Sequence, residues 1–256
     1  MVHRLTFVLL LVACGPAIEE APSSAFRSIQ LPVRPARAGQ ARTGDPAPQP
    51  PPELGLRCDS DCPDAVGMVV FPGPEEGERC TASLITPNQM VTASHCLPAD
   101  RRRPGASCAD AWIGFPGRPA EWVRCDEVVR AHMTDDEQAL RTDVAILRLE
   151  SLVERTPLVV DRTTLPIGDV VTVTSVTPHR VYRSQHFVDS QHCRVHSSDR
   201  AEEYFGPDAA LVGWLGDCPI ERGNSGSPVL DRDGRLRAVV HGGSHPFFGI
   251  GVMSSL

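Results

Sequence analysis

Hydrophobic positions divide the chain into three stretches. Residues 5–13 form one short apolar run, residues 15–54 have few apolar positions without helical or strand period, and residues 56–256 alternate short apolar runs with Gly, Pro, Asp and Asn. Runs of this length between turn-forming residues are typical of β-strands in a sandwich or barrel. The expected strand segments are 66–71, 82–85, 122–123, 128–129, 144–147, 170–174, 229–230 and 238–240.

This pattern predicts an all-β domain over residues 56–256, a length sufficient for two small barrels. One modest helix is expected near residues 135–140. Residues 14–55 are expected to form a disordered Pro/Ala-rich tether, because nine prolines lie between residues 15 and 54 and little apolar surface is available to offset the ordering entropy.

The first thirteen residues have the layout of a secretory signal peptide. One positive charge lies in residues 1–4, and the nine-residue apolar run that follows is too short to span a bilayer as a helix. The run ends Leu11-Val12-Ala13-Cys14-Gly15, which resembles the lipobox of bacterial lipoproteins. We therefore predict export, lipidation of Cys14 and anchoring to the cell envelope, at the outer membrane or cell surface, or release from it. Ordinary cleavage nearby, with Cys14 discarded or free, is the alternative.

Composition limits the classes of function. The hydrophobic fraction of 41% suits a globular core, and the net charge of −7 gives no basic face for nucleic acid. Nine cysteines favour an exported, disulfide-containing protein, and eight remain for the folded part once Cys14 is set aside.

Two motifs carry a candidate base and acid. His95 stands between an apolar run and Cys96, and a disulfide from Cys80 to Cys96 would close a loop of about 16 residues, worth roughly 3 kcal/mol in the chain-entropy model. Asp143 leads directly into another apolar run, where a buried carboxylate is costly unless it is paired, and a histidine would pair it. Taken alone, Asp143 is better explained as the cap of a turn.

The third motif is the run Gly223-Asn224-Ser225-Gly226-Ser227-Pro228. Glycines on both sides of the central serine allow a sharp turn that exposes its hydroxyl and aims successive N–H groups at one point. An oxyanion hole needs that arrangement, and each donor contributes roughly 3–4 kcal/mol in the transition state. A Ser/Gly surface turn is the alternative.

At these three motifs the chain resembles the trypsin-like, or chymotrypsin-fold, serine proteases. Their histidine motif Thr-Ala-Ala-His-Cys is similar to residues 92–96, and their aspartate motif matches residues 143–147. Their serine motif Gly-Asp-Ser-Gly-Gly-Pro is similar to residues 223–228. The chain order His, Asp, Ser is also the order of that family.

The resemblance implies two six-stranded antiparallel β-barrels with the active site between them. It implies a monomeric serine endopeptidase that hydrolyses protein or peptide substrates through an acyl-enzyme, without a cofactor or metal. Ser225 would attack the peptide carbonyl while His95 takes its proton, and Asp143 would orient the imidazole. The N–H groups of Gly223 and Ser225 would bind the oxyanion.

A nearer resemblance is to a bacterial subgroup that includes the glutamyl endopeptidases, in which the serine motif takes the form seen here. Relatives also have a cysteine seven residues before the serine, as at Cys218, and its expected partner is Cys193. Proximity in the chain suggests the pairs Cys58–Cys62 and Cys108–Cys125, although sequence does not fix connectivity.

The same resemblance suggests substrate-binding residues. Pro219 takes the place of the aspartate on the trypsin pocket floor, six residues before the serine, so cleavage after Arg or Lys is not expected. Glutamyl enzymes place a histidine near the pocket in a context similar to His241-Gly242-Gly243. A preference for glutamate follows if His241 binds it, and a structural role for His241 is an equal alternative.

Asn224 replaces the aspartate that pairs with a newly cut N-terminal amine in trypsin-like zymogens. We therefore predict that activation does not use that ion pair.

Three other interpretations fit the sequence less well. A catalytically inactive, protease-like surface binding protein would need a broken triad or a blocked oxyanion hole, and all three triad residues are present. An α/β-hydrolase would place its histidine last and would need helices. A metal site at His192-Cys193-x-x-His196 has loose spacing, and Cys193 suits a disulfide better.

Overall fold

A computed structural model of the chain describes residues 54–58, 62–71, 78–117, 119–131, 143–178, 184–197, 213–221, 223–243 and 251–255. These residues form β-strands, turns and two short 3-10 helices, which confirms the predicted all-β class. None of the described helices has the length and apolar character needed to cross a membrane. The predicted signal peptide, lipidated Cys14, nearly all of the tether and the helix near residues 135–140 lie outside the described residues.

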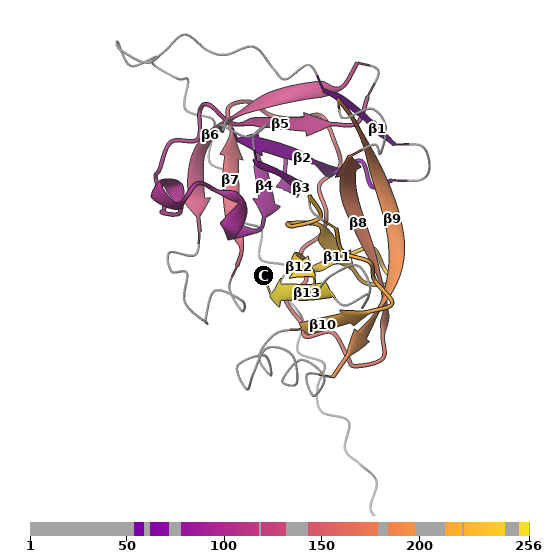
Figure 1. Cartoon of the computed structure of the whole chain (residues 1–256). Coiled ribbons are helices and arrows are strands. Elements are labelled where there is room, and N and C mark those ends of the chain that lie inside the picture. The colour runs from indigo at the N-terminus through magenta and orange to yellow at the C-terminus, as the bar shows by residue number, and fades with distance from the viewer. Residues whose placement is uncertain are drawn as a thin grey trace, which may run out of the picture. The chain divides into compact units, whose positions relative to one another are not determined.

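Six strands close the first barrel, and each pairs antiparallel with its neighbours. Alternating burial along Glu121–Arg130 shows one face of that strand packing into the barrel. The core includes Val69, Leu84, Ile113 and Leu147, all fully buried. Around the barrel (Figure 1) the order is β2 (Val66–Phe71), β3 (Glu78–Thr86), β4 (Gln89–Thr92), β7 (Ala145–Leu149), β6 (Glu121–Arg130) and β5 (Trp112–Phe115).

The second sheet also returns on itself, because β11 pairs with β8 and β8 pairs with β9. Its apolar core includes Val173, Val195, Leu215 and Val240. A short additional strand, β1 (Gly55–Cys58), runs parallel to β9. The antiparallel order is β8 (Val170–Pro178), β9 (Gln185–His196), β10 (Gly213–Gly216), β13 (Gly251–Ser255), β12 (Leu236–Gly243) and β11 (Pro228–Leu230).

The two barrels share an apolar cluster. Val91 of β4 and Val144 pack with Leu230 of β11 and with Leu236 and Val239 of β12. Because Val144 is next to Asp143 in the chain, burial of this cluster fixes the backbone that carries Asp143.

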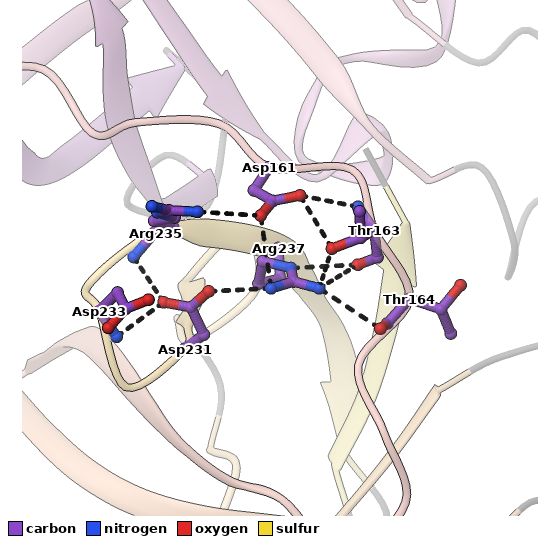
Figure 2. Close-up of polar contacts among 7 residues, drawn as sticks. All are labelled: Asp161, Thr163, Thr164, Asp231, Asp233, Arg235 and Arg237. Atoms are coloured by element: carbon purple, nitrogen blue, oxygen red, sulfur yellow. Dashed lines mark hydrogen bonds and ion pairs between the residues drawn. The ribbon is translucent and has the colours of Figure 1, made fainter. Parts of the chain in front are cut away.

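The segment that connects the barrels is attached to β12 by backbone and side-chain bonds. The Leu236 N–H donates to the Val159 carbonyl at 2.8 Å, and the Asp161 N–H donates to the Leu236 carbonyl at 2.9 Å. Figure 2 shows Arg237 between this segment and the β11–β12 turn. Its Nη1 donates to Asp231 Oδ2 at 2.9 Å, and its Nε donates to the Thr163 carbonyl at 3.0 Å.

The described residues contain four disulfides, and they are the four predicted pairs: Cys58–Cys62, Cys80–Cys96, Cys108–Cys125 and Cys193–Cys218. Two of them restrain the candidate site. One joins β3 to the turn that carries His95, and another joins β9 to the segment that leads into the Ser225 loop.

Candidate active site

His95 lies in a single turn of 3-10 helix, η1 (Ser94–Cys96), shortly after β4 ends. The turn is held by the disulfide at Cys96 and by Arg102, whose Nη2 donates to the His95 carbonyl at 3.1 Å and whose Nε donates to the Leu97 carbonyl at 2.9 Å. The backbone of His95 is therefore fixed, while its side chain remains 38% exposed.

Asp143 lies two residues before β7, and its side chain is only 4% exposed. Its Oδ1 accepts the His95 backbone N–H at 2.8 Å, and its Oδ2 lies 2.6 Å from His95 Nδ1. With Nδ1 as the donor, Nε2 of the neutral imidazole is the acceptor nitrogen. The buried carboxylate is thus paired, and the pairing leaves a basic nitrogen for another group.

The pKa of Asp143 is set by two opposing effects. Burial raises the pKa of this carboxyl, whereas hydrogen bonds from His241 and His95 and the charges of both imidazoles lower it. The lowering effects together prevail, so the pKa lies well below the usual value. Asp143 is therefore an anion at neutral pH and accepts hydrogen bonds from both imidazoles.

Ser225 lies in a tight turn that requires glycine on both sides. Gly223 has a φ of 98° and Gly226 a φ of 81°. A Cβ at Gly226 would lie 2.2 Å from the Thr81 carbonyl oxygen and 2.3 Å from Thr92 Oγ1. The second barrel can approach the first so closely at this point because the residue after Ser225 has no side chain.

Thr81 of β3 anchors the Ser225 loop from the first barrel. Its N–H donates to the Ser225 carbonyl at 2.9 Å, and its hydroxyl donates to the Gly223 carbonyl at 3.1 Å. The same hydroxyl accepts the Val176 N–H at 2.9 Å. Thr81 lies in none of the three motifs predicted to carry the chemistry, and its position next to Cys80 is the local signal that points to it.

Asn224 closes the loop with its own side chain. This residue is 1% exposed, and its Oδ1 accepts the Glu221 N–H at 2.7 Å. The Asn224 carbonyl accepts the Ser227 N–H at 3.0 Å, and the Ser227 hydroxyl donates to Ser175 Oγ at 2.8 Å. These bonds hold the turn within the second barrel.

His241 contacts Asp143 from the first barrel and Ser225 from the second. Its Nδ1 makes a short hydrogen bond to Asp143 Oδ2, and its carbonyl accepts the Ser225 hydroxyl at 3.1 Å. The rings of His241 and His95 lie edge to face, with centroids 5.0 Å apart. Within the described residues no hydrogen bond joins Ser225 Oγ to His95, yet both residues lie against His241.

A β-bulge accounts for the direction of the His241 side chain. Val240 pairs with Met253 and Gly242 pairs with Val252, so His241 is the extra residue that has no partner on β13. Bulges commonly redirect a side chain beside an active site. The family resemblance suggests His241 as a substrate-binding group. Since Nδ1 is engaged by Asp143, that role would have to use Nε2.

The two N–H groups predicted to form an oxyanion hole are available. Within the described part of the chain, no acceptor contacts the N–H of Gly223 or of Ser225, whereas the Gly226 N–H donates to the Val240 carbonyl at 2.7 Å. The remaining predicted substrate-binding residues are placed as follows: Pro219 is exposed, and Gly242 and Gly243 continue β12 beside β13.

Two sets of residues bear on metal binding. His95, Asp143 and His241 bring candidate ligand atoms within 4.8 Å of one another. The alternative site at His192 and Cys193 is not supported, because Cys193 is bonded to Cys218 and has no free thiolate.

Comparison with known proteins agrees with this geometry. Residues 80–239 match the family described as the trypsin-like peptidase domain. No curated protein matches the chain in sequence. Among solved structures, mouse brain neuropsin, a serine protease, matches with a TM-score of 0.59 and 14% identity, covering 78% of this chain and 94% of its own.

Two microbial proteases have similar folds. The thermostable serine protease AL20 from an extremophilic microorganism matches with a TM-score of 0.55 and 15% identity, over 75% of this chain and 91% of its own. The protease Anisep from Arthrobacter nicotinovorans matches with a TM-score of 0.55 and 15% identity, over 75% of this chain and 90% of its own. At these identities the likeness concerns the fold.

Proposed function

The chain belongs to the family of trypsin-like peptidase domains, and from this premise we propose that it is a serine endopeptidase with His95, Asp143 and Ser225 as its catalytic triad. The observation that carries the proposal is the meeting of these residues at His241. His95 and Asp143 are joined by two hydrogen bonds, and Ser225 and Asp143 both contact His241.

The chemistry is acyl transfer in two steps. Ser225 Oγ attacks the peptide carbonyl as its proton passes to His95 Nε2, and His95 then protonates the departing amine. Asp143 holds the Nδ1–H tautomer and stabilises the imidazolium. The N–H groups of Gly223 and Ser225 bind the developing oxyanion, and a water molecule repeats the sequence on the acyl-enzyme.

The Ser225 hydroxyl has to turn for this reaction. Its present acceptor is the His241 carbonyl, and rotation about the Cα–Cβ bond redirects the proton. Catalytic hydrogen bonds are often long or unformed without substrate, so the resting contact is compatible with the mechanism.

Substrate preference is proposed from the same residues. Pro219 carries no carboxylate that could bind an Arg or Lys side chain. Glutamate-containing substrates are the first to test, because His241 Nε2 is free of the bond to Asp143 and its side chain is 24% exposed. A protein exported to the cell envelope, anchored through Cys14, would meet its substrates outside the cytoplasm, and the four disulfides agree with export.

A fluorophosphonate probe tests the proposal directly. The purified chain should be labelled on Ser225, and Ser225→Ala should lose both the label and the hydrolysis of a peptide library. Ser151→Ala is the matched control, because this serine is exposed in the segment that connects the barrels and, among the described residues, makes no contact with the Ser225 loop. A folded wild-type protein that neither labels nor cleaves would contradict the proposal and favour a protease-like binding protein.

A further inference from the structure

Three metal-ligating side chains meet at the site from three separate elements. His95 comes from η1, Asp143 from the segment before β7, and His241 from the bulge in β12. Both imidazoles direct Nδ1 at the same carboxylate oxygen, Asp143 Oδ2. The acyl-transfer steps proposed above use the contact from His95 Nδ1 to Asp143 and do not use the one from His241 Nδ1.

We propose that His95, Asp143 and His241 form a binding site for Zn²⁺, and that the bound ion reversibly inhibits the peptidase. The inhibitory part of this inference rests on the proposed function. The binding part does not, because it depends on the three side chains alone.

The donor atoms suit the ion. Two imidazole nitrogens and one carboxylate oxygen are a ligand set that Zn²⁺ accepts with water in the fourth position. Imidazole also binds other divalent transition metals, so Co²⁺ can serve as a spectroscopic substitute. The Asp143 carboxylate offsets part of the charge of the ion.

The geometry needs a small adjustment. Ligands at about 2.0–2.2 Å from a tetrahedral zinc lie about 3.3–3.6 Å apart, whereas His95 Nδ1 is 2.6 Å from Asp143 Oδ2. The imidazoles must therefore retreat by about 1 Å to admit the ion. Asp143 is 4% exposed, but the side chains of His95 and His241 are 38% and 24% exposed, so both rings have solvent beside them and the ion has a way in.

Binding would change which nitrogen of His95 carries the proton. Each imidazole now holds its proton on Nδ1 and donates it to Asp143. To bind the metal through Nδ1, a neutral ring loses that proton to solvent and takes another on Nε2. The Nε2 of His95 is then a donor and cannot accept the proton of Ser225. The metal would thus remove the general base while leaving every residue in place.

His241 is the ligand that makes this site differ from a His–Asp pair. Without it, one imidazole and one carboxylate offer two ligands, whereas protein zinc sites take three or four. The competing explanation is that His241 is a positioning residue, a second hydrogen-bond donor that steadies Asp143. Asparagine separates the two, because its amide N–H can replace the Nδ1–H donor but is a poor ligand for zinc.

Binding is measured on the full chain carrying Ser225→Ala, which retains all three ligands and cannot digest itself. Calorimetric titration with ZnCl₂ should give one ion per chain, and Co²⁺ should give visible absorption bands that Zn²⁺ abolishes. Adding His241→Asn, or His241→Gln in a second variant, should weaken binding at least about tenfold. His192→Asn, which changes a histidine on β9, should leave binding unchanged. No saturable binding, or equal binding by the His241 variants, would overturn the inference.

Inhibition is measured on the wild-type chain with a fluorogenic peptide, each variant being compared with its own metal-free rate. Zn²⁺ should abolish hydrolysis at the concentration at which it binds, EDTA should restore it, and His241→Asn should shift the inhibition curve at least about tenfold upward. Binding without inhibition would refute the inhibitory role. If the metal-free enzyme is inactive and unlabelled by the probe, the proposed function fails while the binding result remains interpretable.

Discussion

The two barrels contribute to the site in different ways. His95 and Asp143 belong to the first barrel and are joined by two hydrogen bonds within it. Ser225 belongs to the second barrel, yet its loop is held by the N–H and hydroxyl of Thr81 from the first. His95 and Asp143, the proposed base and the residue proposed to orient it, are therefore assembled inside one barrel, whereas the position of Ser225, the proposed nucleophile, depends on packing between the two barrels.

The restraints on each side follow the same division. The turn with His95 is fixed within the first barrel by the Cys80–Cys96 disulfide and by Arg102. The Ser225 loop combines the local bond of Asn224 with contacts across the barrels. We expect changes in the first barrel to affect chemistry strongly, and changes at the junction to affect stability and alignment together.

Asp143→Asn should cause the largest effect. The carboxylate accepts the backbone N–H of His95 with one oxygen and the Nδ1–H with the other, whereas an amide has only one oxygen. The variant would therefore no longer hold the imidazole in its Nδ1–H tautomer, and kcat should fall by about 10⁴-fold. Steady-state hydrolysis of a peptide substrate measures the loss, and urea unfolding shows whether the variant is folded. Asp126→Asn, on the exposed side of β6, is the matched control and should stay near wild type. A decrease in kcat of less than about tenfold for Asp143→Asn would contradict the proposed role of Asp143 in orienting the imidazole.

His186 should make the junction sensitive to acid. It is 2% exposed on β9, and its Nε2 lies 3.2 Å from Arg79 Nη1 of β3. Burial and, secondarily, the charge of Arg79 lower the pKa of His186 to about 4. An unfolded histidine takes its proton near pH 6.5, so between pH 6.5 and 4 the unfolded state binds more protons. Stability present above pH 6.5 should therefore fall by at most about 3 kcal/mol as the pH drops to 4.

Urea unfolding across this pH range tests the prediction, with His186→Gln as the variant that cannot titrate. Its unfolding free energy should change less with pH than that of the wild type. Asp143 acts in the same direction but in a lower range, because its pKa is lowered from 3.8 and its contribution is lost only as the pH falls below that value. Parallel curves for the wild type and His186→Gln would rule out the histidine as the cause.

Arg237→Ala should loosen the connection between the barrels. Its guanidinium bonds to Asp231 and to the Thr163 carbonyl, so removal leaves several polar groups without their donor. We expect a loss of about 2 kcal/mol in the free energy of unfolding. Arg237→Lys keeps the charge but loses the forked geometry of the guanidinium. Its free energy of unfolding should lie between those of the wild type and Arg237→Ala. An Arg237→Ala variant as stable as the wild type would show that the connection needs no such attachment.

Thr81→Val should have the smallest effect and is the sharpest test of the comparison. The substitution keeps the backbone bond to Ser225 but removes the hydroxyl between Gly223 and Val176. We expect a loss of about 1 kcal/mol in stability and a roughly three- to tenfold loss in kcat. Thr177→Val, whose hydroxyl lies 3.5 Å from the Phe187 carbonyl within the second barrel, should leave kcat unchanged. Loss of stability without loss of kcat in Thr81→Val would mean that Ser225 is aligned from its own barrel.

Sequence predicts best the features that are local in the chain. The triad proposed at His95, Asp143 and Ser225 rests on three short motifs, and all four predicted disulfides are confirmed, with partners 4 to 25 residues apart. Proximity suggested Cys58–Cys62 and Cys108–Cys125, whereas the family resemblance suggested Cys193–Cys218. Thr81 could not be identified in this way, since its partners are about 95 and 142 residues distant.

The direction of the His241 side chain could not be predicted from the sequence either. One extra residue in a strand turns a side chain to the other face, and nothing in the Val240-His241-Gly242 run marks the bulge. The apolar pattern does not give the twelve-residue extent of β9 for a related reason. Its buried positions include His186 and Cys193 rather than a regular apolar alternation.

The side chain of Asn224 has a wider consequence. Because this amide closes the Ser225 loop from within, we expect the polypeptide to reach its working conformation as it folds, without a maturation cut upstream. An N-terminal fusion partner or a long leader would then leave turnover intact. Protection of the producing cell would have to come from timing of export or from a small reversible inhibitor.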